Sequence, residues 1–299
     1  MNTSTNQRLF LILKWTCFFL FAGRAYQHLV WDIPIRALLW DQDLMEGLIT
    51  TITGMTWQEY ATSQIQDIWI QTGKQVMGVF YALCAIFTLI INERRKWMGI
   101  TLLVGSGCLT FLAFLYYKEK FFHVGQLFEY TAQVISPVLL YLVLFTQVPS
   151  SRIMLIGKVT IALTFTCHGL YAFGYYPQPG QFVDMVIRGF FLDEPGARLL
   201  LKVAGVLDFV ISVGIFLPRR IATPCLWYAV VWGGMTALAR VTTQFYIDFP
   251  WDSINQNLPD FLYRIPHAGL PLAMWWMMKH EKVNEVGKET YGKIAGVPA

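Results

Sequence analysis

Eight long apolar stretches run through this chain of 299 residues, and they limit its fold more than any other feature of the sequence. A helix needs about 20 apolar residues to cross the hydrocarbon core of a bilayer. Each stretch reaches that length with few ionisable residues. The sequence predicts an all-α, polytopic membrane bundle with eight transmembrane helices, at about residues 9–30, 70–91, 97–117, 125–147, 153–175, 197–217, 221–246 and 260–279.

The composition agrees with a membrane protein. Hydrophobic residues make up 55% of the chain and charged residues 14%, against about 25% charged residues in soluble domains. Trp and Tyr anchor proteins at the headgroup level, and aromatic residues account for 16% of this sequence. No basic stripe with interleaved aromatics is present, so nucleic acid is not an expected partner, and the lipid bilayer is.

The first apolar stretch follows Arg8, as in a secretory signal, but it has no clean small-x-small cleavage site. Its far end carries Arg24 and His28 instead of a processing region. We therefore interpret it as a retained first span.

The connectors between the stretches separate by charge, apart from Lys118 and Lys120. Cytoplasmic loops of membrane proteins carry an excess of Lys and Arg. The sequence therefore predicts a multi-pass protein of the plasma (inner) membrane with both termini in the cytoplasm. The basic connectors contain Arg94, Arg95, Lys96, Arg152, Lys158, Arg219, Arg220 and the lysines of the tail; the acidic ones contain Asp32, Asp41, Asp43, Glu46, Glu59, Asp67, Asp184, Asp193, Glu194, Asp248 and Asp252.

The two halves of the chain match in order and in detail. Lys14 stands ten residues before Arg24, and Lys158 stands ten residues before His168. Each half also has a Pro-containing exit, an outward connector, a basic turn and a polar residue four positions before a proline. With four spans each, both halves enter from the same side, so the repeats are parallel. We expect two four-helix repeats, residues 1–148 and 149–281, followed by a cytoplasmic tail, residues 282–299.

The outward connectors have helical periodicity. Thr56 and Glu59 form a capping-box pattern that predicts the start of a short helix. Apolar residues at spacings of three and four predict amphipathic helices on the outer surface or across the mouth of the bundle. They are Ile35, Leu38, Leu39, Met45, Leu48, Ile49 and Ile52 in the first connector, and Phe182, Met185, Val186, Gly189 and Phe190 in the second.

Ionisable residues within the spans concentrate in one layer, in the outer half of the bundle. Such residues mark functional sites more often than not. The layer predicts a cationic pocket for an anion, a polar headgroup or a quinone ring, with histidines as proton donors. The expected ligand-binding residues are Arg24, His28, Lys74, His168, Lys202, Asp208, Arg240, Arg264 and His267.

A structural role for the same residues is the alternative. The cations would extend outward to the interface or pair with acidic connectors, and Lys202 with Asp208 would only lock helices together. No HxxxH or ExxH spacing supports haem or a metal, so no metal is predicted. The five cysteines lie far apart without a CxxC pair, which does not favour a thiol relay or a clustered zinc site.

The layout resembles the DoxX/DoxD-like superfamily of four-helix membrane proteins, here tandemly duplicated. The resemblance rests on Gly23-Arg24 and His168-Gly169 in the first span of each half, the long outward connector and the glycine-rich second span that ends in a basic turn. It implies a quinone- or sulfur-linked role, because some members are similar to membrane subunits of thiosulfate:quinone oxidoreduction. This chain departs from the simple pattern, since Arg24 in one half is replaced by His168 in the other.

Three functions follow from these observations. The first is a redox-linked accessory subunit whose outer pocket binds a quinone-like or anionic small molecule, with quinone as the candidate cofactor. The second is a small-anion transporter, which would need polar groups through to the cytoplasmic side. The third is a non-catalytic assembly partner that docks a redox or other protein through its outward helices. The sequence does not decide whether the chain is an enzyme.

Overall fold

The computed structural model describes residues 3–295, with side chains for residues 7–280, so the expected tail at residues 282–299 lies outside the described side chains. The all-α prediction is confirmed, since every regular element of the described chain is a helix. The helices are α1 (Thr3–Val30), α2 (Arg36–Leu39), α3 (Gln42–Thr53), α4 (Trp57–Thr62), α5 (Gln64–Ile90), α6 (Lys96–Glu119), α7 (Val124–Glu129), α8 (Thr131–Phe145), α9 (Ser150–Phe173), α10 (Gly180–Phe190), α11 (Glu194–Gly214), α12 (Arg219–Thr242), α13 (Pro250–Tyr263) and α14 (Pro266–Ala295).

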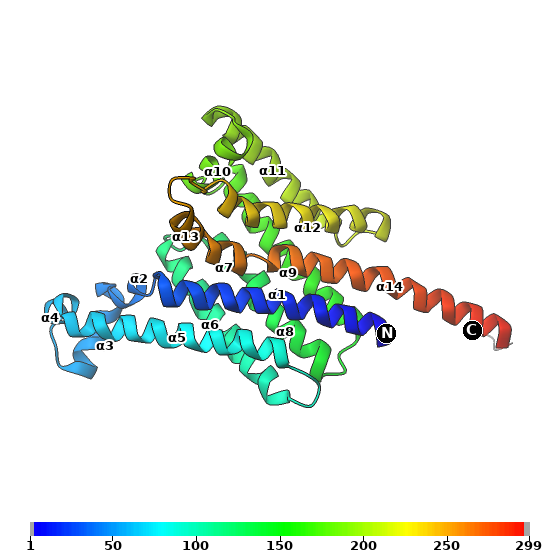
Figure 1. Cartoon of the computed structure of the whole chain (residues 1–299), viewed down its shortest axis with the longest axis horizontal. Coiled ribbons are helices and arrows are strands. Elements are labelled where there is room, and N and C mark those ends of the chain that lie inside the picture. The colour runs from blue at the N-terminus through cyan, green and yellow to red at the C-terminus, as the bar shows by residue number, and fades with distance from the viewer. Residues whose placement is uncertain (1–2, 296–299) are drawn as a thin grey trace.

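Four inner helices form the centre of the molecule. Helix α1 packs against α8 and α14, and α9 packs against the same two helices from the other side. An outer helix covers each of them: α5 on α1, α6 on α8, α11 on α9 and α12 on α14. Helices α2, α3, α4, α10 and α13 lie at one end, which we call the connector end, on the left and upper left of Figure 1. The N-terminus lies at the opposite, basic end.

Within the part of the chain that the structure describes, six helical segments are long and apolar enough to cross a membrane, so a multi-pass membrane protein is supported, whereas the predicted count of eight is not confirmed. Helix α11 does not contain an apolar stretch of this length, because Arg198, Lys202 and Asp208 interrupt its sequence. The described side chains of α14 end at His280. The six spans are Gln7–Val30, Gln64–Ile90, Lys96–Glu119, Val124–Phe145, Ser150–Phe173 and Arg219–Thr242.

The last span of each half differs from its prediction. The stretch at 260–279 is not one helix, because α13 ends at Tyr263 and α14 begins at Pro266. Pro266 therefore starts a helix and does not kink one, since the first turn leaves its N–H groups unbonded in any case. Residues 125–147 likewise divide at Tyr130 into α7 and α8.

The connector helices form largely as the pattern predicts. The capping box is confirmed, with the Thr56 hydroxyl accepting from the Glu59 N–H and the Glu59 carboxylate accepting from the Thr56 N–H. The first amphipathic stretch is broken near Trp40, and Asp41 then caps α3 by accepting from the Leu44 N–H. Val183 and Val186 bury the apolar face of α10 against α11.

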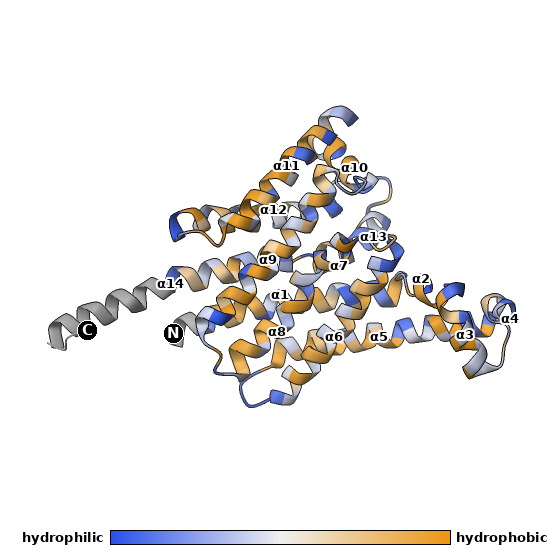
Figure 2. Ribbon diagram, turned by 180° about the vertical axis from the view of Figure 1, so that it is seen from behind, coloured by the Kyte–Doolittle hydropathy of each residue, from blue (hydrophilic) through white to orange (hydrophobic). Residues whose placement is uncertain are grey.

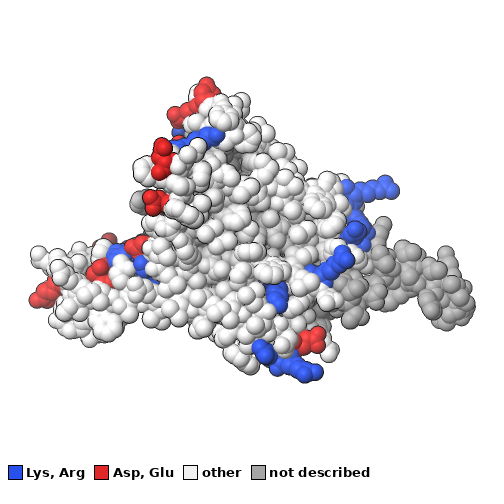
Figure 3. Space-filling view, viewed as in Figure 1, with Lys and Arg blue, Asp and Glu red and all other residues white. Residues whose placement is uncertain are grey.

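Charged side chains lie at the two ends of the molecule. Figure 2 shows apolar residues along the long helices between these ends. In Figure 3, Lys and Arg dominate the basic end, most Asp and Glu lie at the connector end, and the surface between them carries almost no charge. Lys118, an exception to the predicted charge separation, forms an ion pair with Asp41 at the connector end. The carboxylate of Asp41, in an acidic connector, therefore balances the positive charge of Lys118.

Helices α9 and α11 approach closely at Gly205, which generates a first prediction. A Cβ atom there would lie 2.7 Å from the backbone N of Phe173 and 2.8 Å from the carbonyl O of Gly169. Because backbone atoms cannot move aside cheaply, we expect Gly205→Ala to lower the free energy of unfolding by about 1–3 kcal/mol. Denaturation in detergent measures this. Gly107→Ala is the control, since nothing lies within 4 Å of its added Cβ; equal destabilisation by both would contradict the prediction.

The Asp41–Lys118 pair generates a pH prediction. Lys118, and then the Leu44 N–H, hold the pKa of Asp41 below its ordinary value of 3.8. A carboxylate whose pKa is lower in the folded state stabilises above its ordinary pKa, and that contribution is lost as the pH falls through the lowered pKa. Protection factors of the α3 amides against hydrogen exchange should therefore fall in that window. Asp41→Asn should remove this fall in protection with falling pH, and Asp43→Asn, the control, should keep it. If the fall persists in Asp41→Asn, Asp41 is not its cause.

Candidate functional site

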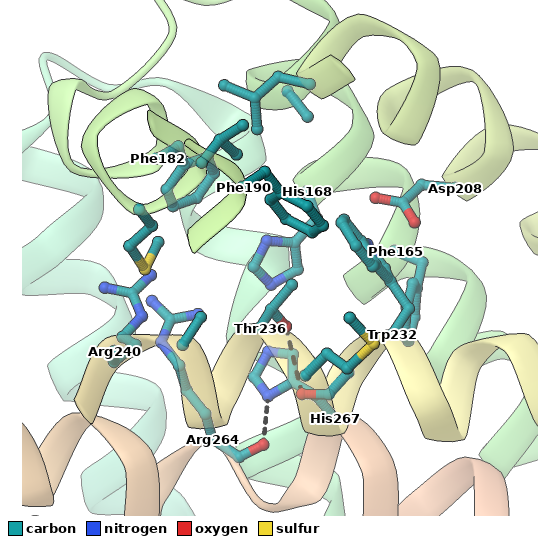
Figure 4. Close-up of a pocket in the computed structure, with 17 residues that line it drawn as sticks. Phe165, His168, Phe182, Phe190, Asp208, Trp232, Thr236, Arg240, Arg264 and His267 are labelled. Atoms are coloured by element: carbon teal, nitrogen blue, oxygen red, sulfur yellow. Dashed lines mark hydrogen bonds between the residues drawn. The ribbon is translucent and has the colours of Figure 1, made fainter. Parts of the chain in front are cut away.

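A cavity opens in the second half of the bundle, between α9, α10, α11, α12 and the start of α14. The empty space between its walls, together with the part open at its mouth, is about 810 Å³. Aromatic side chains form much of its wall, including Phe165, Phe182, Phe190 and Trp232 (Figure 4). The other lining residues are His168, Ala172, Met185, Val186, Leu201, Asp208, Gly233, Met235, Thr236, Ala239, Arg240, Arg264 and His267.

Unpartnered polar atoms distinguish this cavity from the rest of the interior. Among the described residues, six buried side-chain nitrogen or oxygen atoms have no hydrogen-bond partner within the protein, and five of them belong to lining residues. Because nearly all buried polar atoms in folded proteins are hydrogen-bonded, such a concentration needs an explanation. A ligand with polar groups would provide one. The five atoms are His168 Nε2, Asp208 Oδ1, Arg240 Nε, Arg264 Nε and His267 Nε2.

Two histidine rings meet inside the cavity. The centroids of His168 and His267 are 5.1 Å apart, with an edge-to-face arrangement. His267 Nδ1 lies 2.9 Å from the carbonyl oxygen of Arg264. Because a carbonyl only accepts, Nδ1 carries the proton, and Nε2 of the neutral ring is left as an acceptor. His168 Nε2 lies 3.5 Å from Glu129 Oε1, too far for a well-formed hydrogen bond.

Each arginine of the cavity has a carboxylate beside it. Arg264 Nη1 lies 3.3 Å from Glu129 Oε1, and Arg240 Nη1 lies 3.4 Å from Asp260 Oδ2. Arg240 also donates to Gln181 Oε1 at 2.8 Å. Glu129 of α7 and Asp260 of α13 therefore balance the two arginines of the cavity, whereas Arg24 and Lys74, which the expected cationic layer also included, lie outside it.

The cavity has two chemically different sides. In Figure 4 the two arginines lie together on one side, Asp208 lies on the opposite side, and the histidine rings lie between them. Asp208 is 1% exposed. A molecule in this space would therefore meet hydrogen-bond donors at one end and an acceptor at the other.

Arg24 lies in a separate cage in the first half. Its guanidinium is fully buried and donates to Gln133 Oε1 at 2.6 and 3.0 Å and to Gln27 Oε1 at 2.7 Å. Rings of Tyr116, Tyr130 and Tyr263 surround it, the last at 3.7 Å. No ion pair to Arg24 occurs among the described side chains, so amides and aromatic faces alone stabilise its charge.

Tyr263 connects this cage to the cavity. Its ring covers Arg24, and its hydroxyl donates to Asp260 Oδ1 at 2.5 Å. Asp260 in turn lies beside Arg240 of the cavity. Tyr263 and Asp260 therefore form a continuous set of contacts from Arg24 to Arg240 of the cavity.

The remaining expected site residues lie elsewhere. His28 Nδ1 lies 2.7 Å from the carbonyl oxygen of Arg24, and Lys74 donates to the carbonyl oxygen of Trp31 at 2.7 Å. Lys202 is exposed and lines no part of the cavity. Five of the nine expected residues therefore share one cavity: His168, Asp208, Arg240, Arg264 and His267.

Sequence reasoning did not assign Asp260 or Gln181 to the site. Asp260, Tyr263, Arg264 and His267 follow one another at spacings of three and four, which could have indicated a polar face. No sequence pattern indicated Gln181, because its hydrogen bond with Arg240 joins residues that are 59 positions apart. No group of three or more His, Cys, Asp or Glu side chains within the described residues is arranged to hold a metal.

No protein-family model, no curated protein and no solved structure matches this chain. The interpretation of the cavity therefore rests on its own chemistry.

The Arg24 cage generates a third prediction. Gln133 supplies the acceptor for two of the guanidinium nitrogens. Hydrogen bonds to charged groups contribute about 1.5–3 kcal/mol, so we expect Gln133→Leu to lower the free energy of unfolding by about that amount. Gln133→Glu keeps the acceptor and should retain stability. Denaturation in detergent compares the two variants, and equal losses would argue against hydrogen bonding as the cause.

Proposed function

We propose that the chain is a plasma-membrane (inner-membrane) protein with eight spans in two parallel four-helix repeats. Corresponding helices pack in corresponding ways: α1 with α5 and α9 with α11, then α6 with α8 and α12 with α14. The polar centres also correspond. Arg24 of α1 contacts Gln133 of α8, and His168 of α9 contacts His267 of α14.

The charge distribution supports an orientation with both termini in the cytoplasm. Arg94, Arg152 and Arg219 follow or begin helices at the basic end, and the acidic connectors lie at the other end. Under the positive-inside rule the basic end is cytoplasmic. The cavity, which α10 covers at the connector end, then lies toward the outer leaflet.

The cavity, in this proposal, binds a quinone-like molecule with an uncharged, flat ring. The observation that carries the proposal is the set of five unpartnered polar atoms within one aromatic-walled cavity. Quinone carbonyls accept hydrogen bonds, which Arg240 Nε and Arg264 Nε can donate. Asp208 Oδ1 can accept one from the hydroxyl of the reduced form at the other side.

An uncharged ring fits this cavity better than a free anion does. Glu129 and Asp260 already balance the two guanidinium groups, and a third carboxylate, Asp208, lies within the cavity. A small anion would have to enter a largely apolar space that offers no uncompensated cation, where its desolvation is costly. Transport also lacks support, because many buried residues nearer the basic end, such as Leu13, Leu102 and Ile161, are apolar. The buried hydroxyls of Thr16, Thr88 and Thr160 are uncharged and donate to carbonyl oxygens of their own helices.

A redox-linked accessory role follows from the resemblance to DoxX/DoxD-like proteins and belongs to the same proposal. A partner protein would meet α3, whose Leu44, Leu48 and Ile52 are all exposed. The connector residues Leu38 and Phe182 are less suitable for docking than their spacing suggests. Leu38 packs against a core cluster around Ile33, and Phe182 lines the cavity.

Quinone binding tests this function. We expect a short-chain benzoquinone to bind the purified protein in lipid nanodiscs, measured by calorimetric titration. His168→Phe and His267→Phe keep an aromatic ring but remove the polar atoms. Because Nε2 of neutral His267 accepts, His267→Phe should weaken binding of the reduced hydroquinone, titrated in the same way, by about tenfold or more, the equivalent of about 1.4 kcal/mol. His168→Phe, which removes a nitrogen that can donate to a quinone carbonyl, should weaken binding of the benzoquinone by a similar factor.

Lys202→Ala is the matched control, because Lys202 lies on α11 with Asp208 but is exposed and outside the cavity. It should leave the affinity unchanged. The proposal is wrong if the benzoquinone does not bind, or if Lys202→Ala weakens it as much as the histidine variants do. Binding or liposome uptake of sulfate in place of the quinone would favour the anion alternative.

A further inference from the structure

The mouth of the cavity can be located from the exposure of its lining residues. Phe190 is 51% exposed and Met235 is 47% exposed, whereas the ionisable lining residues Asp208, Arg240 and His267 are at most 4% exposed. The cavity therefore opens beside Phe190 and Met235, and its polar groups lie deeper inside.

Apolar side chains are exposed on α11 and α12, two of the helices that line the cavity. Val203 and Leu207 on α11 are 50% and 40% exposed, and Leu238 on α12 is 50% exposed. Helices α11 and α12 meet at the turn near residues 215–218 and diverge toward the connector end, as Figures 1 and 2 show. On the face seen in Figure 3, the surface over these helices is almost uncharged between the two ends of the molecule, and the exposed Lys202 lies on the part of α11 nearer the connector end. An exposed apolar rim at this depth is suited to lipid, not to water.

Helix α10 closes the opposite, connector-side approach. Its apolar residues Phe182, Met185 and Val186 line the cavity. Its polar residues Gln181 and Asp184 line a separate, polar hollow on the outer surface. The helix therefore stands between the cavity and the aqueous side.

Two hydrogen bonds hold α10 in this position. Arg240 donates to Gln181 at the start of α10. Arg188, near its end, donates to the hydroxyl of Tyr246. Both ends of the helix are thus tied to the segment from α12 to α13, which keeps the aqueous approach covered.

We propose that the ligand enters sideways from the bilayer, between α11 and α12, and that it is an amphiphile whose hydrocarbon tail remains in that opening. This inference rests on the proposed function, since it places the ring of the ligand among the five unpartnered polar atoms. It adds that the ligand is a membrane-dissolved molecule and not a water-soluble one. Burial of a tail against apolar side chains would add affinity to that of the ring.

The test compares two benzoquinones with the same ring on the full-length protein in nanodiscs. One has no tail, and the other has an isoprenoid tail with a photoreactive diazirine. We expect the diazirine to label peptides of α11 and α12 near Leu207 and Met235. We also expect Met235→Trp, which narrows the mouth, to weaken binding of the tailed quinone by about tenfold more than it weakens binding of the tailless quinone.

Val79→Trp is the control, because Val79 on α5 is 53% exposed and lies far from the cavity lining. It should change neither affinity. Labelling confined to α13 and to helices α2 to α4, or equal effects of Met235→Trp on both quinones, overturns sideways entry while ring binding still supports the proposed function. If neither quinone binds the unmodified protein, the proposed function itself fails and this inference fails with it.

Discussion

The contact of Tyr263 with Arg24 and Asp260 is the interaction on which the interior of this protein depends. Its ring lies 3.7 Å from the guanidinium group of Arg24, and its hydroxyl donates to Asp260 at 2.5 Å. A buried charge in a low-dielectric interior needs partners for its hydrogen bonds, and water is excluded there. Tyr263 stabilises the cation of the first half and positions the carboxylate that lies beside Arg240 in the second. The two polar centres are therefore one connected system.

The two halves satisfy their polar groups to different degrees. In the first half, Gln27 and Gln133 bind every guanidinium nitrogen of Arg24, and tyrosine rings close the space around it. In the second half, the Nε2 atoms of His168 and His267 have no hydrogen-bond partner within the protein. A buried polar centre whose groups are all hydrogen-bonded within the protein makes the bundle rigid, whereas a centre with unpartnered groups can bind a ligand. We therefore interpret the first half as the structural support of a site in the second.

Charge balance and access together define the ligand that we propose. The two arginines face three carboxylates, Glu129, Asp260 and Asp208, so the cavity has no surplus positive charge to attract an anion, and the aromatic walls favour a flat apolar molecule. The polar atoms are deep, the mouth is apolar, and α10 covers the aqueous side. All three features agree with a ligand that is dissolved in the membrane and has a polar ring. Each feature comes from a different set of residues.

The sequence by itself determined the all-helical class, most of the long apolar helices, the capping box at Thr56 and the amphipathic connectors, because these depend on local periodicity and capping. It also selected His168, Asp208, Arg240, Arg264 and His267, because ionisable residues in apolar segments are conspicuous. Only the tertiary structure decided that these five share a cavity, that Arg24 lies in a cage of its own and that Lys202 is exposed. It alone brought Glu129 to Arg264 across 135 residues of sequence. Such pairings depend on how helices pack, and packing is a property of facing surfaces that no single segment contains.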